Sequence, residues 1–419
     1  MLSNLFWGIL VKNYLSVLQN VVDNGKIKGN RTGVGTRYLF SEKFRHDMGT
    51  GFPLLTTKKI NPKQVLGELF GFLTGADTVQ DFQKFGCNIW NAWGLQNEQY
   101  KLVLRSEAEY VQELSRVKEI DEDEALRQLR AVEKESCEWV KEYQQTMAKI
   151  SSGEIETEHD ESIESLQAKV SEQLARKPKD VIEWLSTEGV TIHVKDIEFA
   201  EGYLGPIYGK QWLEWKASNG EIINQIKRIA SQLENCPLSR RIILTAWNPE
   251  VVPADRYATY PNGKPTASSS DQIQCAILDG KQALPPCHLM VILDVDVDQE
   301  AEVTSLNMEV IMRSTDVPIG LPFNIASYAY LMEMICSQFG MSPGMLVIEM
   351  VNCHVYEDQL ELAKEQLTRI PAALPKLAPI PQDIKFDDPD TLTPEALQRI
   401  LDCLIDYNPQ SFIKYPVAV

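Results

Sequence analysis

Two stretches of one texture, separated by a stretch of another, most constrain what this chain can fold into. Residues 1–94 and 201–419 alternate apolar runs with Gly and Pro, which is typical of strands and helices joined by turns. Residues 95–200 are instead highly charged and carry apolar residues at helical spacing, Leu114 and Val117 among them. We therefore predict one domain formed by residues 1–94 and 201–419, interrupted by an inserted helical hairpin at 95–200. A solvated spacer is the favoured interpretation of the insertion, and a partner-binding element is the alternative.

The composition of the 419 residues narrows the classes of protein. A net charge of −18 argues against a general nucleic-acid binder, because contact with phosphates needs clustered Lys and Arg. It is compatible with a small phosphorylated ligand held by a few arginines. The eight cysteines show no CxxC or zinc-like spacing, the first residues show no signal-peptide pattern, and no apolar run is long enough to span a membrane. We expect a cytoplasmic protein without a metal site and without nucleic-acid or membrane partners.

The stretch ALPPCHLMV at 283–291 presents a cysteine in a stiff setting. Pro285 and Pro286 restrict the backbone before Cys287, and His288 begins a strand-like apolar run. A nucleophilic thiol needs fixed geometry and a lowered pKa, so this pattern predicts a candidate nucleophile. The alternative is a buried cysteine with a packing role only.

Arginines recur beside predicted turns and strands in spite of the acidic composition. Arg31 lies in the Gly-rich turn NRTGVGT, Arg240 and Arg241 begin a strand-like run, and Arg313 with Ser314 follows another. The stretch MRSTDVPIGLPFN that carries Arg313 ends in Asn324, which we expect just before a helix. Glycines let a backbone approach an anion, and guanidinium groups bind phosphate bidentately. The four arginines together predict an anion site, whereas each alone is typical of a surface ion pair.

Three further patterns suggest polar or aromatic ligand contacts. His354 and Tyr356 share one face of a predicted strand, so both could hydrogen-bond one hydroxyl group. Glu68 is placed at the head of an apolar helix, where it either relays protons with a perturbed pKa or favours the helix N-terminus. Trp90 and Trp93 in NIWNAWG either fill the core or stack on a flat ligand.

Ten motifs outside the insertion, taken in order, resemble the thymidylate synthase family. They are NGKIKGNRTGVGT, GFPLLTTKKI, GELFGFLTG, NIWNAW, GYLGPIYGKQW, SRRIILTAWNP, ALPPCH, RSTDVPIGLPFNIASYAYL, HVYEDQ and the final PVAV. The resemblance implies a layered α/β fold of the α+β kind, with a large mixed sheet packed by helices. It also implies a homodimer that binds dUMP and uses 5,10-methylenetetrahydrofolate as cosubstrate.

The resemblance also implies a role for each candidate residue. Cys287 would add to C6 of the pyrimidine, with proton transfer organised by Glu68, Tyr208 and His288. The nucleotide would be held at its phosphate, base and 3′-hydroxyl by Arg31, Arg313, Ser314, Asn324, His354 and Tyr356, with Arg240 and Arg241 reaching in from a second subunit. The folate side would be lined by Lys58, Trp90, Trp93, Asp316 and the terminal carboxylate of Val419.

Several departures from the family pattern bear on the reaction. Met312 stands where thymidylate synthases carry Gln, Gly71 where they carry Trp, Asn91 where an acidic residue is usual, and Tyr415 in place of Ala. Met-Arg-Ser and His-Val-Tyr are also found in viral deoxycytidylate hydroxymethylases, in which the base-reading residue is Asp. Because Asn324 is retained, the combination favours a viral, bacteriophage-type deoxyuridylate hydroxymethylase that serves DNA modification. A thymidylate synthase is the alternative, and a catalytically idle homologue that binds a partner through its insertion is the third.

Overall fold

The computed structural model describes most of the chain, in separate ranges. These are residues 9–29, 34–96, 99–103, 114–116, 118–128, 195–199, 201–253, 273, 276–277, 280–298 and 303–417. The chain divides into two compact units, one formed by Met1–Asn97 with Ala200–Val419 and the other by Glu98–Phe199. The first unit contains all the predicted site residues.

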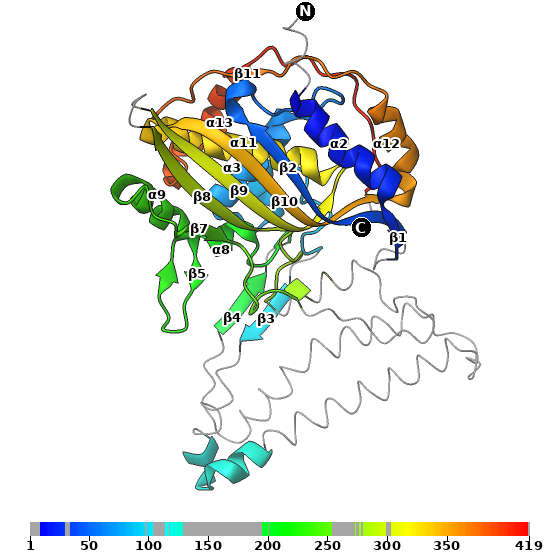
Figure 1. The fold of residues 1–419 in the computed structure, drawn as a ribbon. Helices are drawn as coiled ribbons and strands as arrows, with labels where there is room; N and C mark the ends of the chain where they lie inside the picture. Colours follow the sequence, from blue (N-terminus) through cyan, green and yellow to red (C-terminus); the bar gives the residue numbers. More distant parts are fainter. Residues whose placement is uncertain are drawn as a thin grey trace, which may run out of the picture. The chain divides into compact units, whose positions relative to one another are not determined.

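A mixed sheet is the framework of the first unit (Figure 1). Among the described residues it has six strands in the order β1-β2-β10-β9-β8-β7. Neighbouring strands are antiparallel except β9 and β10, which are parallel. The strand bounds are β1 Lys26–Lys28, β2 Thr36–Asp47, β7 Ile242–Thr245, β8 His288–Asp298, β9 Val303–Asp316 and β10 Ser342–Tyr356. The predicted mixed sheet packed by helices is therefore confirmed.

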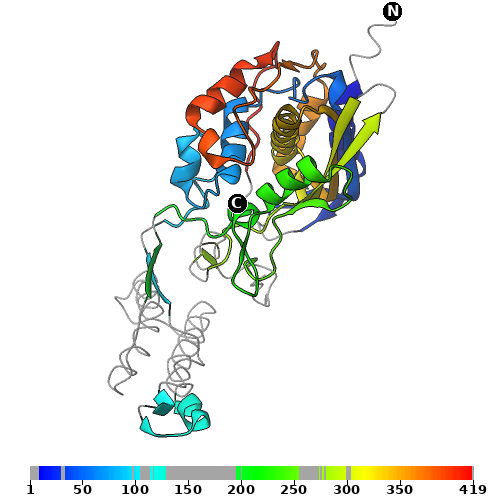
Figure 2. The same ribbon diagram turned by 90° about the vertical axis from the view of Figure 1, so that its left-hand side faces the viewer.

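The parallel pair β9 and β10 is joined by helix α11, Gly320–Phe339. Parallel neighbours need a crossover connection, and a helix that covers the sheet is the usual one. Apart from Glu333, α11 carries no charged side chain, and it is buried on most of its circumference. Such a helix belongs in a core, between the sheet and a second layer of structure. Figure 2 shows the gold α11 between the sheet and helices that include the blue α3 and the red α13.

Helices α2 and α3 place further parts of the core. Helix α2, Ile9–Asn24, packs against β2 and β10 and ends where the Gly25 amide donates to the Val21 carbonyl. Helix α3, Pro62–Leu73, begins with the Asn61 side chain as its cap and is buried from Val65 to Leu73. The remaining helices are α4 Val79–Lys84, α8 Tyr208–Leu213, α9 Gln225–Asn235, α12 Leu360–Leu367 and α13 Pro394–Asp402.

Two predicted element boundaries are wrong. Glu68 lies in the middle of α3, not at its head, because the helix already begins at Pro62. It therefore cannot act on the helix N-terminus. Asn324 was expected just before a helix, but α11 begins at Gly320 and Asn324 lies in its second turn. In both cases a proline in the first turn of the helix marks the start better than the polar residue does.

The second unit, Glu98–Phe199, is described only in part. Its two ends pair as antiparallel strands, β3 Gln99–Val103 and β4 Lys195–Phe199, which the sequence did not predict. Residues 122–128 are helical, with Ala125 buried. Residues 114–116 are helical as well, with Leu114 buried, and most of the remaining predicted hairpin lies outside the described residues. Within the described ranges of the chain, no helix is both long enough and apolar enough to cross a membrane.

Truncation of a core residue in β10 provides a test of this packing. Leu346 is fully buried between β2 and β9. We expect Leu346→Ala to lower the free energy of unfolding by about 2–5 kcal/mol, because the change removes apolar contacts and leaves a cavity. Urea unfolding measures the effect. Leu238→Ala, at a side chain that is 67% exposed, is the matched control and should change it by less than about 0.5 kcal/mol.

Candidate active site

Most candidate residues meet at one edge of the sheet. The carboxyl ends of the parallel strands β9 and β10 lie side by side, with Asp316 opposite His354 in the register. Helix α11 starts at the same edge because it follows β9 directly. The antiparallel β8 begins there, with His288 opposite Met312. Four elements therefore bring their functional ends together.

Cys287 is half-buried immediately before β8, and hydrogen bonds fix its backbone on both sides. Its amide donates to the Tyr208 hydroxyl at 2.7 Å, and its carbonyl accepts from the Arg313 amide at 2.9 Å. These two contacts tie the residue to α8 and to β9. The thiol therefore projects from a backbone that has little freedom to move.

Arg313 explains why two prolines precede the cysteine. Its Nε donates to the Pro286 carbonyl and its Nη2 to the Pro285 carbonyl, both at 2.8 Å. The same Nη2 lies 3.8 Å from Cys287 Sγ. Prolines keep their carbonyls because they lose only their N–H, and their fixed φ restricts the backbone that carries these two acceptors. A positive charge thus lies next to the Cys287 sulfur.

His288 is sandwiched between two tyrosines. The Tyr208 ring stacks on it, with ring centroids 4.1 Å apart and planes 15° from parallel. Its Nδ1 shares a hydrogen bond of 2.5 Å with the hydroxyl of Tyr328. Burial lowers the pKa of His288 to about 3, so the imidazole is neutral at pH 7. Tyr328 was not among the predicted residues, although it follows Asn324 by four positions and so shares its helix face.

A tight crossing of two loops brings Tyr208 to the cysteine. Gly205 has φ +72°, and a Cβ added there would lie 2.1 Å from the Lys281 carbonyl oxygen. Ala283 in turn donates its amide to the Leu204 carbonyl. Only a glycine allows this approach of the loop before α8 to the loop before Cys287.

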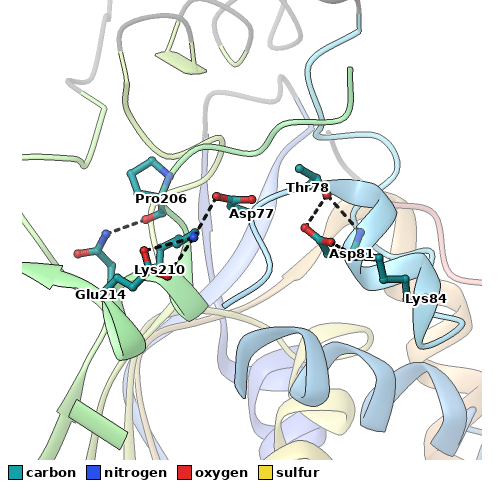
Figure 3. Close-up of polar contacts among 8 residues, drawn as sticks. Asp77, Thr78, Asp81, Lys84, Pro206, Lys210 and Glu214 are labelled. Carbon is teal, nitrogen blue, oxygen red and sulfur yellow. Dashed lines mark hydrogen bonds and ion pairs between the residues drawn. The ribbon is translucent and has the colours of Figure 1, made fainter. Parts of the chain in front are cut away.

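Ion pairs and amide contacts hold α8 in the same place (Figure 3). Lys210 Nζ lies 3.4 Å from Asp77 and 3.2 Å from Glu214. The Pro206 carbonyl accepts from the side chains of both Gln211 and Gln282, at 2.8 and 2.9 Å. Tyr208 therefore starts a helix that is fixed to both neighbouring loops.

Glu68 and Trp90 form a buried pair. The indole Nε1 donates to Glu68 Oε1 at 3.1 Å, and the two residues are 8% and 5% exposed. Burial raises the pKa of Glu68 to about 7, and the hydrogen bond from Trp90 opposes that rise. The Phe72 ring contacts Trp90, Tyr208 and His288, so it connects this pair to the residues around Cys287.

Gly71 does not leave the opening that its small size suggests. A Cβ at Gly71 would lie 2.4 Å from two ring carbons of Phe82, and Phe82 is fully buried. The Phe82 ring occupies the place where a side chain at position 71 would begin. Phe82 therefore fills space beside α3 at the position where Gly71 stands in place of the family's Trp.

A second cluster surrounds Asp316 at the end of β9. Its carboxylate accepts from the Ile319 amide at 2.9 Å and from the Gln359 side chain at 3.0 Å. Burial raises the pKa of Asp316, and these hydrogen bonds oppose that rise. The His354 and Tyr356 rings meet edge to face, with centroids 5.1 Å apart. Burial lowers the pKa of His354, while the Asp316 carboxylate raises it.

Lys58 and Tyr415 join this cluster to the C-terminal segment. Lys58 is 4% exposed, donates to the Pro318 carbonyl and lies 4.9 Å from the centroid of the Tyr415 ring. Burial lowers the pKa of Lys58 to about 8, against the influence of Asp316. The Tyr415 hydroxyl donates to Gln366 at 2.7 Å and lies 3.1 Å from the Leu362 carbonyl. The exchange of Ala for Tyr415 thus adds an anchor for the C-terminal segment.

The other predicted residues are distributed less closely. Asn324 lies near Asp316, because a Cβ on Gly320 would lie within 4 Å of both side chains. Ser314 on β9 lies opposite Asn352 on β10 in the strand register. Trp93 is half-buried, and its backbone amide donates to the Trp90 carbonyl. Arg240 and Arg241 are exposed just before β7. Arg31 and Val419 lie outside the described residues.

Comparison with known proteins identifies the family. The family model described as thymidylate synthase matches residues 12–419. A thymidylate synthase of Listeria monocytogenes serovar 1/2a is 32% identical over 413 residues, which cover 98% of this chain and 100% of that protein. One of Listeria innocua serovar 6a is 32% identical over 409 residues, with the same coverage of both chains. The chain belongs to the thymidylate synthase family.

Membership of the thymidylate synthase family confirms the resemblance in the ordered motifs and makes the protein a one-carbon transferase. Both relatives are named thymidylate synthase, which agrees with the alternative better than with the predicted hydroxymethylase. Within the ranges that the structure describes, no group of His, Cys, Asp and Glu side chains could hold a metal ion.

The raised pKa of Glu68 predicts a pH dependence of stability. The folded protein binds this proton up to about pH 7, the unfolded chain only to about pH 4.5. The stabilising contribution of the neutral carboxyl is therefore complete below pH 4.5 and is lost as the pH rises to 7. For a difference of 2.5 pH units this loss is on the order of 3 kcal/mol.

Glu68→Gln removes this titration because its amide stays neutral. We expect the free energy of unfolding of the variant to rise relative to that of the wild type between pH 4.5 and 7, measured in urea at several pH values. Glu361→Gln, at a side chain that is 85% exposed, is the control and should leave the pH dependence unchanged. Parallel curves for Glu68→Gln and the wild type would contradict the perturbed carboxyl.

Proposed function

We propose that the protein is a thymidylate synthase that converts dUMP to dTMP, with 5,10-methylenetetrahydrofolate as cosubstrate and dihydrofolate as the second product. The observation that carries this proposal is the placement of Cys287 between Tyr208 and Arg313 at the start of β8. A thiol held in this way, with a guanidinium 3.8 Å from the sulfur, suits addition to an electron-poor carbon such as C6 of uracil. The family membership and the names of the relatives support the same reaction.

The surrounding residues suit recognition of the nucleotide. An amide at Asn324 both donates and accepts, which matches O4 and N3–H of uracil. His354 and Tyr356, with their rings in contact, suit the sugar hydroxyl. Arg313 and Ser314, together with Arg31, suit the phosphate. Arg240 and Arg241, which are exposed on the protomer, suit a phosphate bound by the second subunit of a homodimer.

Glu68, His288 and Tyr208 suit the movement of protons. Glu68, with a pKa of about 7, can hold or release a proton near neutral pH. The ring of neutral His288 stacks on the ring of Tyr208, whose hydroxyl accepts from the Cys287 amide. The folate supplies the one-carbon unit and, in the reductive reaction, a hydride. Trp93 and Asp316, which are half-buried, are the expected contacts on the folate side. Lys58, Trp90 and the terminal carboxylate of Val419 are the further contacts that we expect there.

Reduction is favoured over hydroxymethylation by the packing around Glu68. Water can complete the reaction only if it reaches the exocyclic carbon, so a dry site favours hydride transfer. Phe82 fills the space next to Gly71, and Trp90 covers the carboxylate of Glu68. Hydroxymethylation of dUMP is the second candidate, because Met312 puts a buried thioether beside Arg313 where the family has an amide.

The products distinguish the two reactions. We expect the purified protein, given dUMP and 5,10-methylenetetrahydrofolate, to release dihydrofolate and a nucleotide heavier by one methyl group. Absorbance of the dihydrofolate band and mass analysis of the nucleotide measure both products. A nucleotide heavier by a hydroxymethyl group, formed without dihydrofolate, would establish the second candidate. If neither a methylated nor a hydroxymethylated nucleotide forms, both candidate reactions are contradicted and a catalytically idle homologue is favoured.

Substitution of the nucleophile separates chemistry from binding. We expect Cys287→Ser to lower kcat by at least about 10⁴-fold, because a serine hydroxyl without a general base is a far weaker nucleophile than a cysteine sulfur. Binding of dUMP, measured by isothermal titration, should stay within about threefold of the wild type. A comparable loss of binding and of rate would show that Cys287 has a structural role.

A further inference from the structure

Phe82 is packed directly on the backbone of α3. The residue lies on the short helix α4 and is fully buried. A Cβ on Gly71 would overlap its ring, with Cδ1 and Cε1 at 2.4 Å, so the two positions are sterically coupled. Glycine within a helix costs stability relative to alanine, and close packing of this ring is a physical reason for its presence.

The Phe82 ring also supports Trp90. The two rings are stacked, with centroids 5.5 Å apart and planes 22° from parallel. Trp90 in turn donates to Glu68, which lies three positions before Gly71 on the same face of α3. The chain of contacts therefore starts and ends on one helix face: Gly71, Phe82, Trp90 and Glu68.

We propose that Phe82 is a positioning residue for the reaction, because its ring sets the distance of the Trp90 indole from α3 and so holds the indole N–H on Glu68. The role rests on the proposed function, in which Glu68 moves protons. The Phe82 ring contacts the rings of Phe72 and Trp90. It acts only through Trp90, and Gly71 is the cradle that lets its ring approach.

Helix α4 is held firmly enough for this role. The Thr78 hydroxyl caps the helix by accepting from the Asp81 amide, and the Asp81 carboxylate binds both Thr78 and Lys84 (Figure 3). The Val79 amide donates to the Gly202 carbonyl. Phe72 packs edge-on against Phe82, with centroids 5.6 Å apart. The ring is thus fixed from its own helix, from a neighbouring loop and from α3.

The charged and titratable groups around Glu68 are few. Cys87, from the loop after α4, and Tyr328, from α11, both have their pKa raised by burial and by the charge of Glu68. Trp90 donates its indole N–H to Glu68, and Phe82 and Phe72 provide apolar surroundings. A displaced Trp90 therefore changes both the hydrogen bonding and the hydration of Glu68.

A cycle of variants tests the role. Phe82→Leu removes the stacking surface, Gly71→Ala pushes the ring outward, and the double variant relieves the overlap because leucine is smaller. We expect each single variant to lower kcat by about tenfold or more, since small displacements of catalytic groups have effects of this size. The double variant should recover part of the loss of Gly71→Ala. Phe386→Leu, at an equally buried ring that packs on Phe339, is the matched control and should keep kcat.

A second background distinguishes positioning from general stability. If Phe82 acts through Glu68, then Phe82→Leu has little further effect on kcat in a protein that already carries Glu68→Gln. In the single variant Phe82→Leu, the pH near 7 at which kcat changes should shift relative to the wild type. Equal losses of kcat in both backgrounds, with an unmoved limb, would overturn the proposal. That result is distinct from failure of the proposed function, in which the wild type forms no methylated or hydroxymethylated nucleotide.

A measurement that needs no turnover tests the role of Phe82 even if the wild type forms no product. The pH dependence of urea unfolding between pH 4.5 and 7 reports the titration of Glu68 in the folded protein, whatever the reaction is. We expect Phe82→Leu to shift this dependence and Phe386→Leu to leave it unchanged. Identical curves for the wild type and both variants would refute the positioning of Glu68 by Phe82.

Discussion

The parallel pairing of β9 with β10 is the constraint on which the rest of the molecule depends. Two parallel neighbours cannot be joined by a tight turn, so the chain must cross over the sheet, and α11 is that crossover. The helix is apolar almost all round because it fills the space between the sheet and the second layer (Figure 2). The same crossover brings the ends of β9 and β10 and the start of α11 to one edge. Polar residues at those three ends are therefore brought together by the topology of the chain.

Burial, rather than pairing of charges, dominates the electrostatics of this edge. It raises the pKa of Glu68, lowers that of His288 and lowers that of Lys58, in each case by disfavouring the charged form. The opposing influences are single hydrogen bonds or one neighbouring carboxylate. Arg313 is different, because two proline carbonyls satisfy its guanidinium and leave its charge next to the thiol. Burial thus brings the pKa values of Glu68 and Lys58 toward the neutral range, which suits a reaction that moves protons near neutral pH.

The departures from the family pattern have compensating partners in the structure. Gly71 is matched by the ring of Phe82, so the loss of one aromatic side chain is offset by another that arrives from α4. Tyr415 is matched by Gln366 and Lys58, which bind its hydroxyl and its ring. In the sequence, Gly71 and Tyr415 are single exchanges relative to the family pattern. In the folded protein each one belongs to a small group of contacting residues, and the group preserves close packing.

Much of this protein was determined by the sequence alone. Ordered motifs predicted the family and the mixed sheet, and the stiff Pro285-Pro286-Cys287 stretch predicted the presentation of the thiol, because these signals are local in the chain. Tertiary structure alone placed Tyr328 on His288, Phe82 on Gly71 and Arg313 on the proline carbonyls. These contacts join residues that are 11 to 40 positions apart. Local propensity and periodicity carry no information about such pairs, since only the path of the chain through space decides which side chains share one volume.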